Sequence, residues 1–213
     1  MKAPLVIVID YGMGNIGSVY NALTQLGASF RVSDRKENVR AADAIILPGV
    51  GAFQAAMHNL RALDLVDELT DQVIGRGKPF LGICLGMQLL ARDSVENGFS
   101  TGLGWLDGHV VAMQPPGLRV PHVGWNGVQI GRPAELFQRI DEGAHFYFDH
   151  SFHLQCRDEW VTATCDYGER YIAAIARGNM LAVQFHPEKS QRNGLKLLRN
   201  FLNAAANSPI QPC

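Results

Sequence analysis

Hydrophobic residues in roughly the first ninety positions form short apolar runs separated by amphipathic stretches. The apolar runs are rich in branched side chains, as in strands buried on both faces, and lie at 5–9, 30–32, 44–47 and 79–83. Helical spacing predicts helices at 15–26, 52–60 and 64–75, and the start of another at 87–91. Buried strands that alternate with helices predict an α/β fold with a central, mostly parallel sheet flanked by helices.

The pattern changes after about residue 104, where short apolar segments are separated by Gly, Pro and Asp. Strands are predicted at 110–113, 128–130, 146–148, 161–164, 172–176 and 181–184. This spacing is typical of hairpins, so the C-terminal half is expected to add antiparallel strands. A last amphipathic helix is predicted at about 194–205. Residues 1–206 are expected to form a single domain, followed by a disordered tail at 207–213.

Composition narrows the class of protein. The chain has 213 residues, of which 47% are hydrophobic and 18% charged, with a formal net charge of -1. Such a balance is ordinary for a soluble enzyme and gives no basic surface for nucleic acid or an anionic membrane. The first apolar run stops at Asp10, far short of the roughly 20 residues that span a membrane. We therefore expect a cytoplasmic protein.

The four cysteines, at positions 84, 156, 165 and 213, form no Cys-x-x-Cys pair. A disulfide framework or a zinc site is therefore not expected. His150 and His153 are three apart in a predicted strand, which would place them on opposite faces. No metal and no cofactor are predicted.

Candidate chemistry centres on Cys84. Residues 82–86 read Gly-Ile-Cys-Leu-Gly and lie directly between a predicted strand and a predicted helix. This is the form of a nucleophile elbow, with cysteine in place of serine. The glycines permit the sharp turn, and the N-terminus of the following helix favours a thiolate. A structural cysteine between packing glycines is the alternative.

A second motif, His186-Pro187-Glu188, follows the last predicted strand. In an extended segment, side chains two residues apart point to the same side, so Glu188 could orient the imidazole of His186. A carboxylate, a histidine and a cysteine form the general triad of nucleophile, base and orienting group.

Segments 82–88, Gly-Ile-Cys-Leu-Gly-Met-Gln, and 184–190, Gln-Phe-His-Pro-Glu-Lys-Ser, resemble the triad-type (class I) glutamine amidotransferases. Segments 10–15, 48–51, 121–126 and 147–151 narrow the resemblance to the glutaminase subunits of imidazole glycerol phosphate synthases of histidine biosynthesis. It covers essentially residues 4–203. The resemblance implies a flavodoxin-like fold and a single glutamine amidotransferase domain.

By this resemblance, Cys84 attacks the side-chain amide of glutamine, His186 moves the protons and Glu188 holds the imidazole. Ammonia leaves, and water hydrolyses the glutamyl thioester. The backbone N–H of Leu85 is one natural oxyanion donor, and Val50 or Gly51 resembles the second contributor. Losing one such donor typically costs about 10²–10³ in rate.

The resemblance also implies substrate and partner contacts. Residues that match glutamine-binding positions are Gln88, Glu96, Ser151 and Phe152. Residues that look like interface or channel-mouth positions are Trp125, Asn126, Tyr147 and Lys189. The partner implied is a (β/α)₈ cyclase subunit in a heterodimer, which receives the ammonia. The chain departs from the family pattern at Asp149 and Phe152, where Val and Tyr are usual.

Three other interpretations remain open. Gly12-x-Gly14-x-x-Gly17, with Asp34 further on, fits a dinucleotide-binding fingerprint. A free-standing cysteine hydrolase would use the same triad. A paralogous glutaminase could feed another synthase, for example one that modifies a cell-surface sugar.

Overall fold

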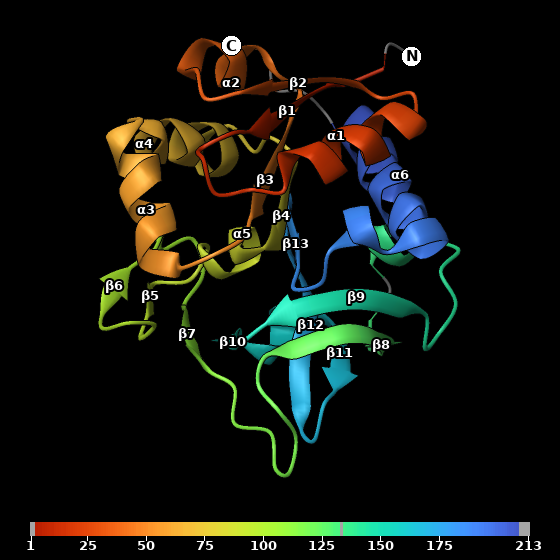
Figure 1. The fold of residues 1–213 in the computed structure, drawn as a ribbon. Coiled ribbons are helices and arrows are strands. Elements are labelled where there is room, and N and C mark those ends of the chain that lie inside the picture. Colours follow the sequence, from red (N-terminus) through yellow and green to blue (C-terminus); the bar gives the residue numbers. More distant parts are fainter. Residues whose placement is uncertain (1–2, 133, 209–213) are drawn as a thin grey trace.

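The computed structural model describes residues 3–132 and 134–208, and its centre is a nine-stranded sheet (Figure 1). Five neighbouring strands are parallel: β2 (Ser29–Ser33), β1 (Leu5–Ile9), β3 (Ala44–Gly49), β4 (Phe80–Cys84) and β13 (Met180–Val183). Their carboxyl ends meet at one edge of the sheet, which is where α/β folds bind ligands. The predicted parallel half of the sheet is confirmed.

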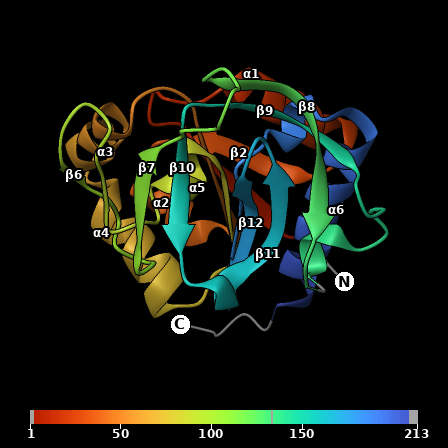
Figure 2. The same cartoon turned by 90° about the horizontal axis from the view of Figure 1, so that it is seen from below.

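Antiparallel strands complete this sheet, as predicted for the C-terminal half. They are β12 (Arg170–Arg177), β11 (Val161–Asp166), β8 (His122–Ile130) and β9 (His145–His150). A second sheet has the order β10 (Phe152–Cys156), β7 (Gly108–Ala112), β5 (Asp93–Ser94) and β6 (Ser100–Thr101). Figure 2 shows β10 and β7 side by side. The sequence pattern missed β5, β6 and β10, because two-residue strands and a strand with one buried residue leave no clear alternation.

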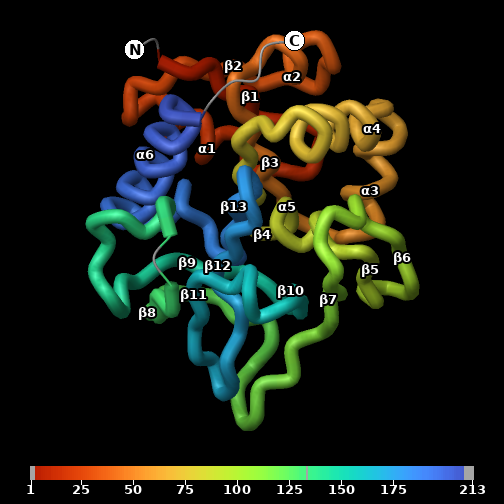
Figure 3. Tube along the Cα trace, turned by 180° about the vertical axis from the view of Figure 1, so that it is seen from behind, coloured from red at the N-terminus to blue at the C-terminus, as the bar shows by residue number. Residues whose placement is uncertain are grey.

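Helices cover both faces of the parallel strands (Figures 1 and 3). Helices α1 (Ile16–Gln25) and α6 (Gln191–Asn207) share one hydrophobic core with the sheet. Helices α3 (Phe53–Ala62) and α4 (Leu65–Thr70) share a second core with the opposite face. In the described part of the chain, no helix is both long and apolar enough to cross a membrane.

The shorter elements differ most from the prediction. Helix α5 (Leu85–Gln88) begins directly after Cys84, so the helix expected at 87–91 starts earlier and is shorter. Helix α2 (Lys36–Ala41) was not predicted, because it buries only Val39. Single turns occur at η1 (Asp71–Gly75), η2 (Glu135–Phe137), η3 (Asp158–Trp160) and η4 (Pro187–Lys189).

The last helix is longer than its apolar pattern suggested. Helix α6 runs through Asn207, so the expected tail at 207–213 begins too early by at least one residue. The rest of that prediction, including Cys213, lies outside the described residues from position 209 onward.

Candidate active site

Cys84 ends strand β4 and has an unusual backbone conformation, with φ 53° and ψ -110°. Non-glycine residues avoid positive φ, so neighbouring structure must hold this turn in place. Gly86 allows the close approach that does so, because a Cβ there would overlap the Leu47 carbonyl of the adjacent strand β3. The predicted sharp strand-to-helix turn is present, with Cys84 buried at the carboxyl edge of the sheet.

His186 and Glu188 come from the turn between β13 and α6. The His186 Nδ1 atom lies 2.8 Å from Glu188 Oε1, and each side chain is only 2% exposed. The two residues face each other because the chain forms the 3-10 turn η4, not because it is extended. The His186 N–H donates to the Tyr147 carbonyl at 2.8 Å, and Ser190 Oγ donates to the His186 carbonyl at 2.6 Å. The first bond holds the turn against strand β9, and the second closes the turn itself.

The imidazole of His186 is strongly biased toward its protonated form. Burial by itself would lower its pKa, but the Cys84 sulfur and the Glu188 carboxylate outweigh that effect and raise the pKa to about 10. Its Nε2 atom is buried and has no hydrogen-bond partner among the described residues, so it is free to exchange a proton with a reacting group. A neighbouring cysteine and a histidine that a carboxylate orients are the groups that nucleophilic catalysis requires.

A cavity of about 430 Å³ opens beside Cys84. It is lined by the seven residues predicted to form the oxyanion hole or to bind glutamine: Val50, Gly51, Leu85, Gln88, Glu96, Ser151 and Phe152. Ala52, Pro121, Asp149 and His150 also line it. Segments 50–52, 84–88 and 149–152 thus converge on one volume, although they lie far apart in the sequence.

Comparison with known proteins identifies the family. The profile described as "Glutamine amidotransferase class-I" matches residues 7–205. The chain belongs to this family. Solved structures agree in fold: a glutamine amidotransferase from Thermotoga maritima has a TM-score of 0.73 at 17% identity, over 98% of this chain and 100% of its own.

Curated relatives of this amidotransferase are more similar in sequence. "Imidazole glycerol phosphate synthase subunit HisH" of Moorella thermoacetica is 49% identical, over 92% of this chain and 93% of the relative. HisH 2 of Vibrio vulnificus is 46% identical, over 93% and 94%. HisH 1 of Campylobacter jejuni is 43% identical, over 93% and 99%. The chain is thus a glutamine amidotransferase enzyme whose similarity to the HisH subunits extends over almost its whole length.

In the loop predicted to complete the oxyanion hole, the Val50 N–H points toward Met13. The Val50 N–H donates to the Met13 carbonyl at 2.6 Å, so it does not serve an oxyanion in this conformation. Gly51 has φ 96°, and a Cβ there would meet the Met13 side chain. Leu85 is the first residue of α5, a position whose N–H has no partner within the helix.

The glycine-rich segment after β1 packs against that same loop. Besides the bond from Val50 to Met13, a Cβ at Gly14 would lie 3.4 Å from the Pro48 ring. Neighbouring protein groups therefore contact the segment where the dinucleotide-binding interpretation would place a pyrophosphate. That interpretation is disfavoured.

Two predicted substrate-binding side chains already have partners within the protein. Gln88 Nε2 donates to the Phe152 carbonyl at 2.9 Å and to Gln184 Oε1 at 3.1 Å. Glu96 Oε2 accepts from the Phe53 N–H at 2.8 Å, at the start of α3. Both residues line the cavity. The amide nitrogen of Gln88 and one carboxylate oxygen of Glu96 are already hydrogen-bonded to other residues of the protein.

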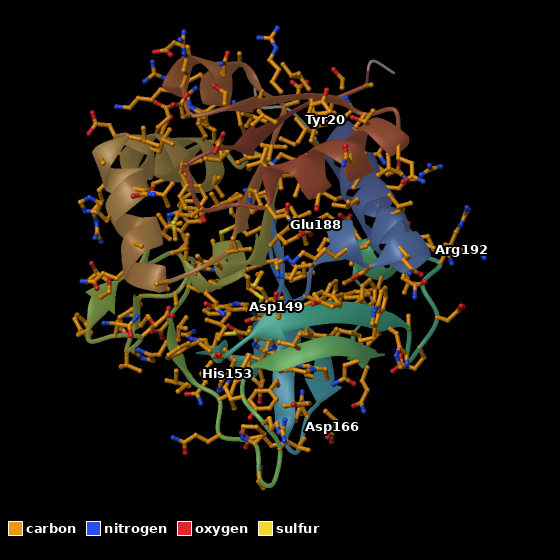
Figure 4. All side chains as sticks on the ribbon, in the orientation of Figure 1. Tyr20, Asp149, His153, Asp166, Glu188 and Arg192 are labelled. Atoms are coloured by element: carbon orange, nitrogen blue, oxygen red, sulfur yellow. The ribbon has the colours of Figure 1, made fainter. Side chains whose placement is uncertain are left out.

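Three of the predicted interface residues form one surface cluster. Trp125 is 46% exposed and meets the Tyr147 ring edge to face, with 6.2 Å between centroids. Lys189 Nζ lies 5.4 Å from the centre of the Tyr147 ring and 3.9 Å from an Asp149 carboxylate oxygen. Figure 4 labels Asp149 at strand β9. The departure at Asp149 therefore supplies an ion-pair partner for Lys189.

Asn126 lies in a different, inward-facing network that the sequence analysis missed. Its Nδ2 atom donates to the Asp166 carbonyl at 2.7 Å and lies 3.3 Å from His122 Nε2. His122 Nδ1 lies 3.2 Å from His150 Nε2, and His150 Nδ1 lies 2.9 Å from the Phe152 carbonyl. His150, the last residue of β9, is therefore a buried residue with both ring nitrogens bonded.

This histidine pair should make the protein sensitive to acid. Burial lowers the pKa of His122 to about 4 and that of His150 to about 3. An unfolded histidine binds a proton near pH 6.5, so stability is present above that pH and falls as the pH drops toward 4. Urea unfolding at pH 7 and pH 5 should show a loss of at most about 1.4 kcal/mol per histidine per pH unit.

His122→Phe is the matched variant, because the ring stacks between Phe148 and Tyr167 at centroid distances of 4.7 and 4.0 Å. Carboxylates titrate alike in both proteins, so the difference between them isolates the histidine. An equal loss of stability between pH 7 and pH 5 in the variant would show that His122 does not cause the sensitivity to acid.

Within the described residues, no group of three or more His, Cys, Asp or Glu side chains gathers in a way that could hold a metal ion. Cys156 and Cys165 are unpaired thiols, and burial raises the pKa of the first to about 11 and of the second to about 12. Both are thus poor nucleophiles at neutral pH.

Proposed function

We propose that this chain is the glutaminase subunit of an imidazole glycerol phosphate synthase in histidine biosynthesis. The observation that carries the proposal is Cys84 on a strained elbow beside the His186–Glu188 pair, at the wall of a cavity large enough for an amino acid. The 43–49% identity to HisH subunits supports the choice of synthase.

In the proposed reaction, the Cys84 sulfur forms a bond to the side-chain amide carbon of glutamine. His186 gives its proton to the amide nitrogen, the carbon–nitrogen bond breaks and ammonia leaves. Water then attacks the thioester carbon and gives a proton to His186, and the carbon–sulfur bond breaks to release glutamate. Glu188 keeps Nδ1 protonated, so that Nε2 faces the reacting groups.

The oxyanion of each tetrahedral intermediate needs donors. We assign Leu85 N–H as the donor present at rest, and Val50 or Gly51 N–H as the donor that arrives on activation. The 2.6 Å bond from Val50 to the Met13 carbonyl has to break for that loop to contribute. Glycines on both sides of Val50 allow its peptide to rotate. The free subunit is therefore expected to hydrolyse glutamine slowly.

The proposed partner is the (β/α)₈ cyclase subunit, in a heterodimer that receives the ammonia. The cluster of Trp125, Tyr147 and Lys189 lies beside Asp149, which lines the cavity, so a partner that covers the cluster would also cover the Asp149 side of the cavity. Ammonia that leaves toward such a partner would not protonate in bulk water. We place the enzyme in the cytoplasm and assign it no cofactor.

Glutamate release by the free chain, and by the chain with a histidine-pathway cyclase and its nucleotide ligand, tests the proposal. We expect release to rise about 10²–10³-fold with the loaded cyclase, the value of one oxyanion donor. Cys84→Ser serves as the inactive control.

Two outcomes would overturn parts of the proposal. If the cyclase has no effect while a covalent glutamine analogue still labels Cys84, the glutaminase serves a different synthase. If no turnover and no labelling occur under any condition, the triad assignment itself is wrong.

A further inference from the structure

The Phe152 carbonyl fixes the direction of a series of hydrogen bonds that ends at the Cys84 sulfur. It accepts from Gln88 Nε2 at 2.9 Å and lies 2.9 Å from His150 Nδ1. A carbonyl oxygen can only accept, so Gln88 must present its NH₂ group and His150 must carry its proton on Nδ1. Helix α5 and strand β10, which carry Gln88 and Phe152, lie against each other (Figure 2).

The orientation of the Gln88 amide in turn sets the orientation of the Gln184 amide next to Cys84. The second N–H of Gln88 donates to Gln184 Oε1 at 3.1 Å. Gln184 must therefore turn its own NH₂ group the other way, where Nε2 donates to Cys84 Sγ at 3.6 Å. Gln184 is fully buried, and its backbone N–H is held by the Ala173 carbonyl at 2.9 Å. The amide is thus held between Gln88 on one side and Cys84 on the other.

We propose that Gln184 is a further catalytic residue, whose side-chain N–H stabilises the Cys84 thiolate, and that Gln88 is the positioning residue that orients it. The proposal rests on the proposed function only in taking Cys84 as the nucleophile. A donor aimed at an anionic sulfur favours the anion, whereas the amide oxygen in the same place would repel it. Reversing the amide of Gln184 would thus turn a favourable contact into an unfavourable one.

A second branch holds the carbonyl in place. With its proton on Nδ1, His150 offers Nε2 as an acceptor to His122 Nδ1, 3.2 Å away. Both lone pairs of the Phe152 oxygen are then occupied, and both histidines are neutral, which agrees with their lowered pKa values. The carbonyl is left with no free position for a water molecule that could compete with Gln88.

The test uses variants that separate two effects: the loss of the Gln184 N–H donor and the reversal of the Gln184 amide. Gln184→Met removes the donor at similar volume. Gln88→Glu can accept but not donate, so it should draw the Gln184 NH₂ toward itself and leave the amide oxygen facing the sulfur. Gln88→Met removes the orienting group without imposing the reverse orientation. The fourth variant is the double substitution Gln88→Glu with Gln184→Met.

The measurement is the rate of Cys84 alkylation by iodoacetamide against pH, on the free chain without glutamine. Peptide mapping separates Cys84 from the other thiols, and thermal melting shows that each variant is folded. For Gln184→Met we expect the midpoint of the profile to rise by about one pH unit, about a tenfold lower rate at neutral pH. Gln88→Glu should shift it at least as far, and Gln88→Met less.

The double variant distinguishes reversal of the amide from simple repulsion by the new carboxylate. If Gln88→Glu acts through Gln184, most of its shift disappears when residue 184 is Met. An unchanged profile for Gln184→Met would overturn the catalytic role. An equal Gln88→Glu shift in both backgrounds would overturn the positioning role. Neither result depends on a synthase partner, so both can be told apart from failure of the proposed function.

Discussion

Glu188→Gln is expected to lower kcat for glutamine hydrolysis about 10³–10⁴-fold, with a much smaller effect on KM. The carboxylate accepts the Nδ1 proton of His186 at 2.8 Å and helps to raise the pKa of that imidazole to about 10. A neutral amide loses the attraction to imidazolium. The variant should therefore lose the protonated His186 that the leaving nitrogen needs.

The surroundings of Glu188 leave glutamine no good orientation. Oε2 of Glu188 is buried without a hydrogen-bond partner in the described structure. If the amide oxygen faces His186, the NH₂ group takes the place of Oε2, where it is buried without an acceptor. If the NH₂ group faces His186, Nδ1 must accept a hydrogen bond and the imidazole proton must lie on Nε2, which is the wrong tautomer. Either arrangement costs stability or activity.

Steady-state glutaminase assays of the activated complex would check this. Glu68→Gln is the matched control, because Glu68 is also buried but lies on helix α4 and is bonded to Arg40, not to a residue of the triad. It should leave kcat unchanged when corrected for the folded fraction. A Glu188→Gln enzyme within tenfold of the unsubstituted kcat would show that the carboxylate does not orient the base.

Gly194→Ala is expected to lower kcat about 10²-fold and to destabilise the fold by about 1–3 kcal/mol. Gly194 lies in the first turns of α6, and a Cβ there would overlap the Pro187 carbonyl. The residues on either side of Pro187 are His186 and Glu188. Relief of the overlap must therefore move the turn that carries both triad partners, and a misplacement of about 1 Å can cost that much rate.

Gly17→Ala provides the control for helix substitution. Gly17 lies in α1, and a Cβ there would meet nothing within 4 Å. This variant should be as stable as the unsubstituted protein, or more stable by about 0.5–1 kcal/mol, with unchanged kcat. Urea unfolding and glutaminase assays on both variants make the comparison. Equal kcat in the two variants would show that the α6 contact does not position the triad.

The elements that the sequence predicted best are those with the longest buried patterns. Strand β1 is buried along almost its whole length, and α1 shows its buried stripe of Val19, Ala22 and Leu23. Strand β10 and helix α2 escaped because too few of their residues are buried to set a period. The pairing of His186 with Glu188 was also foreseen, although from an extended geometry where the structure has a turn.

By itself, the sequence determined the alternation of strands and helices, the position of Cys84 at a strand-to-helix turn, and the family. Only the tertiary structure decided how the polar atoms near Cys84 are used. It directs Val50 N–H to Met13, Asn126 inward, and Gln184 toward the sulfur. The reason is that these bonds join residues up to 100 positions apart, whose orientations are set by neighbours in space. Local hydrophobic periodicity carries no information about which donor meets which acceptor across such a distance.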